Sequence, residues 1–166
     1  MGVADRVAFV HGDAAAYVSD EPVDIAACIG ATWIGNGVRG TLEILERSLK
    51  PGGLVLIGEP FWRHTPSEEG LAACQVSSVH AFAYLPELVE GFGEQGYDLV
   101  EMVLADEDSW DRYRAAQWLN LRRWLDANPD DELAPTMREE LRTAPGMYVR
   151  YERGLLGWGV FALMKR

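Results

Sequence analysis

Leu54-Val-Leu-Ile-Gly-Glu-Pro-Phe-Trp62 is the stretch that decides the fold, and Lys50-Pro51-Gly52-Gly53 introduces it. The Lys-Pro-Gly-Gly turn stops a helical pattern, and an apolar run of strand length follows. Such a run predicts a buried strand in a parallel sheet covered by helices. In open α/β sheets, ligands bind in the crevice outside the carboxyl ends of the strands. Glu59 is therefore the first candidate for a functional residue.

Length, charge and cysteine content narrow the class of protein. The chain has 166 residues, 48% of them apolar, and a net charge of −11. This composition fits one globular domain, residues 1–166, and the negative charge argues against nucleic acid or an anionic membrane as a partner. Cys28 and Cys74 are far apart and fit no metal spacing, so we expect no metal, two reduced thiols and a cytoplasmic protein. A disulfide between them stays open.

Apolar runs and helical patterns alternate along the chain. Strands are predicted at Arg6–His11, Val23–Ile29, Leu54–Ile57, Tyr97–Ala105 and Leu155–Met164. Helices are predicted at Ala14–Val18, Val38–Leu49 and Leu85–Gln95, in a long stretch capped by Ser109 and ended by Asn128-Pro129, and around Leu133–Leu141, stopping before Pro145. The alternation at the start of the chain is typical of right-handed parallel crossovers.

Asp5–Asp13, Val23–Gly30 and Leu49–Pro60 follow one another in an informative order, and the Leu-Lys-Pro-Gly-Gly turn is the most telling piece. Gly157-Trp-Gly-Val-Phe161 adds a final apolar strand. Together these pieces resemble the later part of a class I S-adenosylmethionine-dependent methyltransferase, and uncharacterised bacterial methyltransferase-like proteins in particular. The resemblance implies a three-layer, Rossmann-like α/β sheet that uses S-adenosylmethionine as its cofactor.

The resemblance also marks an absence. Members of the family begin with two strands and a Gly-x-Gly-x-Gly turn, and this sequence has neither, so we expect an N-terminally truncated sheet. In the family's strand order, 3-2-1-4-5-7-6, the absent strands separate Val7–Val10 from Ile25–Ile29. Unpaired apolar edges invite pairing with another chain, so we predict a homodimer or a swapped strand. Alternatively, the N-terminal strand pairs directly with Ile25–Ile29.

Five small or acidic residues match the family's cofactor contacts: Asp13, Ala14, Gly30, Ala31 and Thr32. The resemblance places Asp13 near the adenine amino group, where a carboxylate can accept an N–H. A helix cap is the structural alternative, and the two roles are compatible. The loop from Gly30 passes the sulfonium and the substrate in the family, with Trp33 on the substrate side. An ordinary tight turn, with Trp33 in the core, is the alternative.

Glu59 is the candidate catalytic residue, with Pro60 and Trp62 beside it as candidate substrate contacts. A carboxylate in a crevice can orient or deprotonate an acceptor hydroxyl or amine. A capping or salt-bridged glutamate is the alternative. Methyl transfer depends chiefly on aligning the nucleophile, the methyl group and the sulfur, so it needs neither a catalytic triad nor a metal cluster.

A helical insertion is predicted at residues 107–154, ahead of the final strand. Such a hairpin beside the strand ends would act as a lid over a small amphiphilic or anionic metabolite, with Trp110 and Arg114 as substrate contacts. Core packing for the tryptophan and an exposed face for the arginine are the alternatives.

The sequence as a whole predicts S-adenosylmethionine-dependent methyl transfer to a small-molecule acceptor, and it leaves open whether this chain alone is active. The alternative function belongs to another class: a non-catalytic, dimerising remnant that binds a small molecule or a partner.

Overall fold

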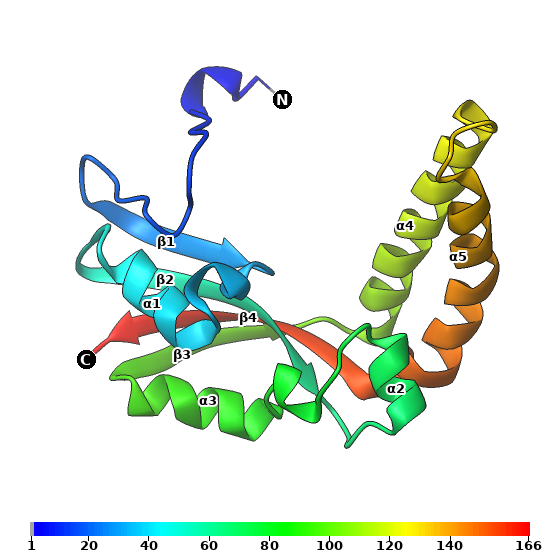
Figure 1. The fold of residues 1–166 in the computed structure, drawn as a ribbon. Helices are drawn as coiled ribbons and strands as arrows, with labels where there is room; N and C mark the ends of the chain where they lie inside the picture. Colours follow the sequence, from blue (N-terminus) through cyan, green and yellow to red (C-terminus); the bar gives the residue numbers. More distant parts are fainter. Residues whose placement is uncertain (1) are drawn as a thin grey trace.

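The computed structural model describes residues 2–166 and contains one mixed sheet, with helical segments before and between its strands along the chain (Figure 1). The strands are β1 (Val23–Ile29), β2 (Leu49–Trp62), β3 (Tyr97–Leu104) and β4 (Leu156–Lys165). The α-helices are α1 (Val38–Glu46), α2 (Glu68–Ala73), α3 (Leu85–Glu94), α4 (Glu107–Ala127), α5 (Ala134–Met147) and α6 (Arg153–Leu155). Short turns of 3-10 helix lie at Ala4–Arg6, Thr32–Gly35 and Val79–Ala81, and a π-helical turn lies at Tyr148–Glu152.

The strand order is β1-β2-β4-β3, with β1 parallel to β2 and β4 antiparallel to both of its neighbours. Ile29 pairs with Gly58, and Glu59 pairs with Gly159. This is the family's 4-5-7-6 order, so the predicted Rossmann-like α/β class is confirmed. The strand predicted from Leu54 is longer than expected, because residues from Leu49 onward already pair with β1 through an irregular register.

The hydrophobic core lies between one face of the sheet and helices α1 and α3. Val55, Ile57 and Phe61 alternate along β2 and point to this face, since successive strand residues point to opposite faces. Leu42 from α1 and Phe92 from α3 pack against them, and both are 1% exposed. The core therefore holds β2 in the centre of the molecule, which fixes the direction in which its carboxyl end points.

The predicted strand at Arg6–His11 is wrong. The chain forms a 3-10 turn at Ala4–Arg6 and then runs without strand or helix to a turn at residues 14–16, so the short helix predicted at Ala14–Val18 is reduced to that turn. Phe9 is 96% exposed and Val10 is 67% exposed. Alternating apolar residues make a strand only where a neighbouring strand supplies hydrogen-bond partners, and this segment pairs with none within the described residues.

Helix ends account for two further corrections. Asp106, not Ser109, caps α4: its carboxylate accepts the backbone N–H of Ser109 at 2.7 Å. Pro145 does not stop α5, which continues to Met147 and passes into the π-helical turn. Helical backbone runs on from α5 through this turn to Leu155, so Pro145 lies inside a continuous helical segment that its missing N–H does not end.

Helices α4 and α5 pack side by side as a hairpin that stands beside the sheet, with its base near the start of β4 (Figure 1). None of the helices in residues 2–166 combines the length and the apolar character that a bilayer span needs.

Candidate functional site

The carboxyl ends of β1 and β2 form the site, because parallel strands end at the same edge of a sheet. The backbone N–H of Gly30 donates to the carbonyl of Gly58 at 2.9 Å, which joins the two strand ends. The hydroxyl of Thr32 then donates to Oε2 of Glu59 at 2.8 Å. The structure thus brings the predicted loop and the predicted catalytic carboxylate into direct contact.

Thr32 is held from behind by the helix that comes after it. The hydroxyl oxygen of Thr41, which is fully buried, lies 2.9 Å from the Thr32 carbonyl oxygen and 2.8 Å from the Gly37 carbonyl oxygen, so its one proton is shared between these two acceptors. The backbone N–H of Gly37 also donates to the Thr32 carbonyl at 2.9 Å. These bonds fix the backbone of Thr32, so its side chain presents a positioned donor to Glu59.

Burial raises the pKa of Glu59 above its usual value, and the hydrogen bond from Thr32 offsets part of that rise. A half-buried carboxyl group of this kind keeps its proton to a higher pH than an exposed one. A raised pKa brings a carboxyl closer to the range in which it can both take up and release a proton near neutrality. The geometry therefore suits Glu59 to hold or accept a proton from a bound hydroxyl or amine.

Gly30 occupies a position that excludes larger residues. Its φ of +72° lies in the left-handed region that favours glycine. A Cβ at this position would also lie 3.0 Å from Cη2 of Trp158, and a Cβ on Gly58 would lie 3.0 Å from Cζ2 of the same ring. The two glycines thus make the space in which the Trp158 indole lies over the ends of β1 and β2.

Trp158 begins a series of rings that we call the aromatic stack, made of Trp158, Trp110 and Tyr113. The first two ring centroids are 6.2 Å apart with planes at 15°, and the second and third are 5.3 Å apart at 25°. Because Trp158 pairs with Pro60, alternation places its ring on the sheet face opposite Glu59. The predicted residue Trp110 therefore reaches the strand ends through a residue that the sequence analysis did not single out.

The other predicted substrate contacts near Glu59 differ in their surroundings. Trp33 is 77% exposed, beside the Gly30 loop, and Pro60 is half-buried. Trp62 is only 1% exposed, its indole N–H donates to the Val79 carbonyl at 2.7 Å, and its ring packs on Phe82. Trp62 is thus a packed interior residue, and its predicted contact with a substrate finds no open surface in the structure.

Asp13 and Ala14 lie apart from the Thr32–Glu59 pair. They line a cavity of about 470 Å³ between the N-terminal segment and β1, together with Ile25 and Ile34. Asp13 is exposed and its carboxylate accepts the backbone N–H of Ala15 at 3.0 Å, so it caps the turn at residues 14–16, where the predicted helix does not form. The five predicted cofactor residues therefore fall into two groups, one on this cavity and one at the strand ends.

Arg114 is already bound inside the protein. Its Nη2 lies 3.0 Å from Oε2 of Glu152, with the two side chains 19% and 7% exposed, and its guanidinium lies 5.8 Å from the centre of the Tyr148 ring. Burial raises the pKa of Glu152, and Arg114 opposes that rise. Arg114, which was predicted to contact a substrate, thus lies in an internal ion pair between α4 and the π-helical turn.

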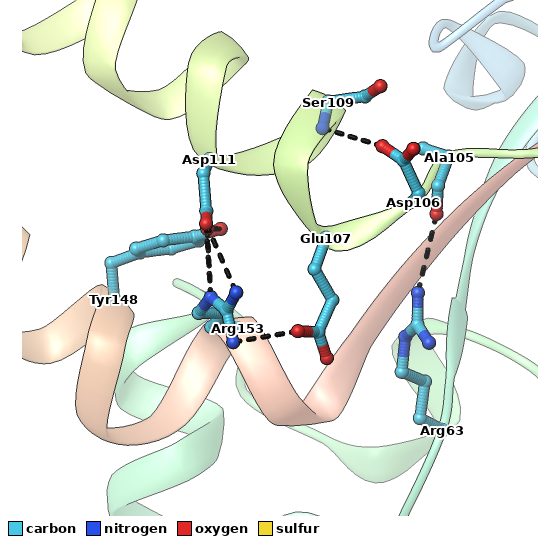
Figure 2. A network of polar contacts seen from close by, with 8 residues as sticks. All are labelled: Arg63, Ala105, Asp106, Glu107, Ser109, Asp111, Tyr148 and Arg153. Carbon is cyan, nitrogen blue, oxygen red and sulfur yellow. Dashed lines mark hydrogen bonds and ion pairs between the residues drawn. The ribbon is translucent and has the colours of Figure 1, made fainter.

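A second network fixes the base of the helical hairpin (Figure 2). Arg153 lies 2.9 Å from Asp111 and 2.8 Å from Glu107, and the Tyr148 hydroxyl donates to Asp111 at 2.5 Å. The hydrogen bonds from Arg153 and Tyr148 hold the pKa of Asp111 below its usual value. The first turns of α4 are thereby tied to the segment that enters β4 and carries Trp158.

Within residues 2–166, no three side chains of histidine, cysteine, aspartate or glutamate gather in a way that could hold a metal ion. Cys28 and Cys74 are both free thiols.

Comparison with known proteins places this geometry in a family, although no family model matches the sequence. One similar solved structure is a SAM-dependent methyltransferase from Geobacter sulfurreducens in complex with S-adenosyl-L-homocysteine. It is 61% identical in sequence, with a TM-score of 0.95, and the match covers 99% of this chain and 67% of the Geobacter chain. A second solved structure, a SAM-dependent methyltransferase from Thiobacillus denitrificans with the same ligand, is 59% identical with a TM-score of 0.93. That match covers 99% of this chain and 67% of the Thiobacillus chain.

A curated relative, the uncharacterized protein YjhP of Escherichia coli K12, is 58% identical over 167 residues, which are 100% of this chain and 67% of that protein. The fold, the site and these relatives together define the class: the chain belongs to the family of S-adenosylmethionine-dependent methyltransferases. The share of the relatives that it spans is compatible with the expectation that the family's first strands lie outside this sequence.

Proposed function

We propose that this chain takes part in methyl transfer from S-adenosylmethionine to a small-molecule acceptor, with Glu59 on the acceptor side. The observation that carries the proposal is the Thr32–Glu59 hydrogen bond at the joined ends of β1 and β2. The two solved relatives support the choice of cofactor, since each holds S-adenosylhomocysteine, the product that such a transfer leaves behind.

The residues present fit part of a cofactor site. The cavity beside β1 has a volume of about 470 Å³, within the usual range for small-molecule sites, and Asp13 supplies a carboxylate that can accept an exocyclic N–H. Gly30, with its left-handed φ, lets the loop to Thr32 turn closely at the strand ends. When bound, the cofactor supplies an electrophilic methyl group on a positively charged sulfur.

The protein's own contribution is alignment and control of one proton. Thr32 fixes one oxygen of Glu59, which leaves the other oxygen free to accept a hydrogen bond from the acceptor's hydroxyl or amine. The raised pKa of Glu59 suits it to take that proton as the acceptor attacks in line. We further propose that Trp33 and Pro60 form the wall of the acceptor site.

We propose that residues 107–154, within the single domain 1–166, serve as a lid beside the site. The aromatic stack supports this role, because it places the base of the hairpin against Trp158 at the strand ends. Trp110 and Tyr113 would then border the acceptor, and Tyr113 is 53% exposed and thus open to a ligand. A small acceptor suits a lid of this kind. The two free thiols fit the cytoplasm as the place of action.

Thermal unfolding with S-adenosylhomocysteine tests the proposal. A ligand at about 100 times its Kd adds roughly 2.7 kcal/mol of stability, and each kcal/mol raises the melting temperature of a protein of this size by roughly 2–4 °C. Saturation should therefore raise it by about 5–10 °C. Thr32→Val should reduce the shift, whereas Thr143→Val on exposed α5 should leave it unchanged. An unmoved melting temperature for the wild-type chain would count against the proposal.

A second candidate function is a non-catalytic, dimerising remnant that binds a small molecule or a partner. The exposed apolar residues of β1 favour it, because Ile25 is 53% exposed and Ile29 is 52% exposed on a strand at the edge of the sheet. A homodimer by light scattering, combined with no thermal shift from S-adenosylhomocysteine, would support this function over methyl transfer.

A further inference from the structure

Four side chains tie the base of the helical hairpin to the segment that enters β4 (Figure 2). The Arg153 guanidinium binds both oxygens of Asp111, at 2.9 Å and 3.1 Å, and also lies 2.8 Å from Glu107. The Tyr148 hydroxyl donates to the same Asp111 carboxylate at 2.5 Å. We call these four residues the hairpin clamp. Because a bidentate guanidinium–carboxylate pair fixes direction as well as distance, the clamp sets how the first turns of α4 lie against the π-helical turn.

The two segments that the clamp joins each carry one ring of the aromatic stack. Trp110 lies between the two carboxylates of the clamp in the first turns of α4, and Trp158 lies five residues after Arg153 in the chain. The centroids of the two indole rings are 6.2 Å apart, with their planes at 15°. The backbone N–H of Ala105, just ahead of α4, also donates to the Trp158 carbonyl at 2.9 Å. A shift of the first turns of α4 would therefore separate the two rings, and the clamp opposes that shift.

The Trp158 ring in turn lies over the joined ends of β1 and β2. A Cβ added at Gly30 would lie 3.0 Å from Cη2 of this ring, and a Cβ added at Gly58 would lie 3.0 Å from its Cζ2. The ring therefore packs directly on the backbone of both glycines, with no side chain between it and the strand ends. The loop that begins at Gly30 continues to Thr32, whose hydroxyl donates to Glu59. The place of the Trp158 ring thus bears on the loop that carries the Thr32–Glu59 pair.

We propose that Arg153 and Asp111 are positioning residues for this site. Through the aromatic stack they hold the indole of Trp158 against Gly30 and Gly58, and the indole fixes the loop that follows Gly30. Neither residue is a catalytic group, because the two side chains bind each other and act on the strand ends only through the stacked rings. This role rests on the proposed function, since it positions the site only if that loop belongs to the methyl-transfer site.

A pair of residues that only stabilises the hairpin predicts a different outcome. Breaking such a pair would lower the melting temperature, but the Trp158 ring would keep its place on the two glycines in every variant that folds. The pair formed by Arg122 and Asp126 is of this kind: it spans one turn near the end of α4, and both side chains are more than half exposed. It supplies the matched control, because it is a guanidinium–carboxylate pair on the same helix as Asp111.

Ring-current shifts measured by NMR on the isotope-labelled full chain test the proposal. An indole ring packed on a glycine displaces the resonances of the glycine's α-protons, so the α-protons of Gly30 and Gly58 report where the Trp158 ring lies. Trp158→Leu gives the resonance positions without the ring. These resonances are read without any ligand, and a change in stability alone does not move them.

Substitutions in the clamp should move the ring. Arg153→Gln should displace the two glycine resonances most of the way toward their Trp158→Leu positions, and Asp111→Ala serves as an independent second variant with the same expected displacement. Arg153→Lys should restore part of the wild-type shift, because it keeps the charge but loses the bidentate geometry. Arg122→Gln should leave both resonances at their wild-type positions. Circular dichroism and melting confirm that each variant folds.

Titration with S-adenosylhomocysteine separates this proposal from the proposed function. Arg153→Gln should weaken binding of this ligand roughly 2- to 30-fold, the range expected of a residue that acts on a site without touching the ligand. If the wild-type chain does not bind the ligand, the proposed function fails, while the ring-current shifts still decide whether the clamp places Trp158. Wild-type resonances in both clamp variants, an equal displacement in Arg122→Gln, or a displaced ring with unchanged affinity would each overturn the proposal.

Discussion

The two edges of the β1–β2 pair differ in how completely this chain builds them. At the carboxyl ends, Thr41 holds Thr32, Thr32 holds Glu59, and two glycines admit Trp158. Along the free side of β1, Phe9 and Ile25 are exposed and the backbone has no partner within the described residues. The difference teaches that the strand ends are ordered by contacts between residues distant in the sequence, whereas the alternating apolar residues beside β1 find no such contacts within the described chain.

The largest change in unfolding free energy is expected when a core residue is truncated, and almost none is expected in the exposed N-terminal segment. Phe161 is 0% exposed, so Phe161→Ala should cost about 3–5 kcal/mol of unfolding free energy in urea titrations. Phe9, at 96% exposed, has little burial to lose, and Phe9→Ala should change stability by less than about 0.5 kcal/mol. A comparable loss at Phe9 would mean that the N-terminal segment is packed in solution, and the contrast between the two edges would fail.

The ion pair of the hairpin should show the next largest effect. Arg114→Met leaves Glu152 buried without its partner, which should cost about 3 kcal/mol in the same urea titrations. The double variant Arg114→Met/Glu152→Leu removes both charges and should recover most of that loss. If Arg114→Met were neutral for stability, the ion pair would not hold the hairpin in place, and this part of the comparison would fail.

Gly30 allows a smaller and more local test. Gly30→Ala meets both a left-handed φ and the Trp158 ring, and should cost about 1–3 kcal/mol of unfolding free energy. Gly91→Ala in α3 is the matched control, because its Cβ would meet nothing within 4 Å. Here the higher helix propensity of alanine should raise the unfolding free energy by about 0.5–1 kcal/mol. Equal changes in unfolding free energy at the two positions would show that the backbone at Gly30 does not require glycine.

The smallest effect concerns the protonation of Glu59. Because its pKa is raised in the folded state, the native protein binds this proton more tightly, and stability is lost as the pH rises from the unfolded value through the folded one. The difference in unfolding free energy between Glu59→Gln and wild type should therefore shift in favour of Glu59→Gln as the pH rises across that window, and then level off. Thr32→Val, which removes a bond that lowers the pKa, should move the window to higher pH. A flat difference between Glu59→Gln and wild type would show an unshifted carboxyl.

Local patterns predicted the central part of the fold. The apolar runs that became β1, β2 and β4 carry their own turn signals, and Glu59 was predicted from its place at a strand end. The segment Arg6–His11 has the same alternation, yet a strand forms only beside another strand, so no local pattern could decide its state. The end of α5 beyond Pro145 likewise depended on the π-helical turn into which the helix passes.

The contacts around the candidate site were harder to predict from the sequence, because they join residues that are distant in sequence. Trp158 and Trp110 stack across 48 positions, and Arg114 finds Glu152 across 38. The glycines at residues 157 and 159 were the one local signal of close packing here, since a Cβ at Gly157 would lie 2.3 Å from the Phe61 ring and one at Gly159 would lie 2.6 Å from the Phe161 ring. The burial of Trp62 beside Glu59 had no such signal.

The most direct measurement is an NMR titration of the ¹⁵N-labelled chain with S-adenosylhomocysteine. We predict saturable shifts of the backbone amides of Gly30, Ala31, Thr32 and Asp13, and of the Glu59 amide beside them, with the amides at the α4–α5 tip unmoved. Spectra that stay unchanged at saturating ligand, or shifts confined to the helical hairpin, would contradict the claim that these strand ends belong to a methyltransferase site.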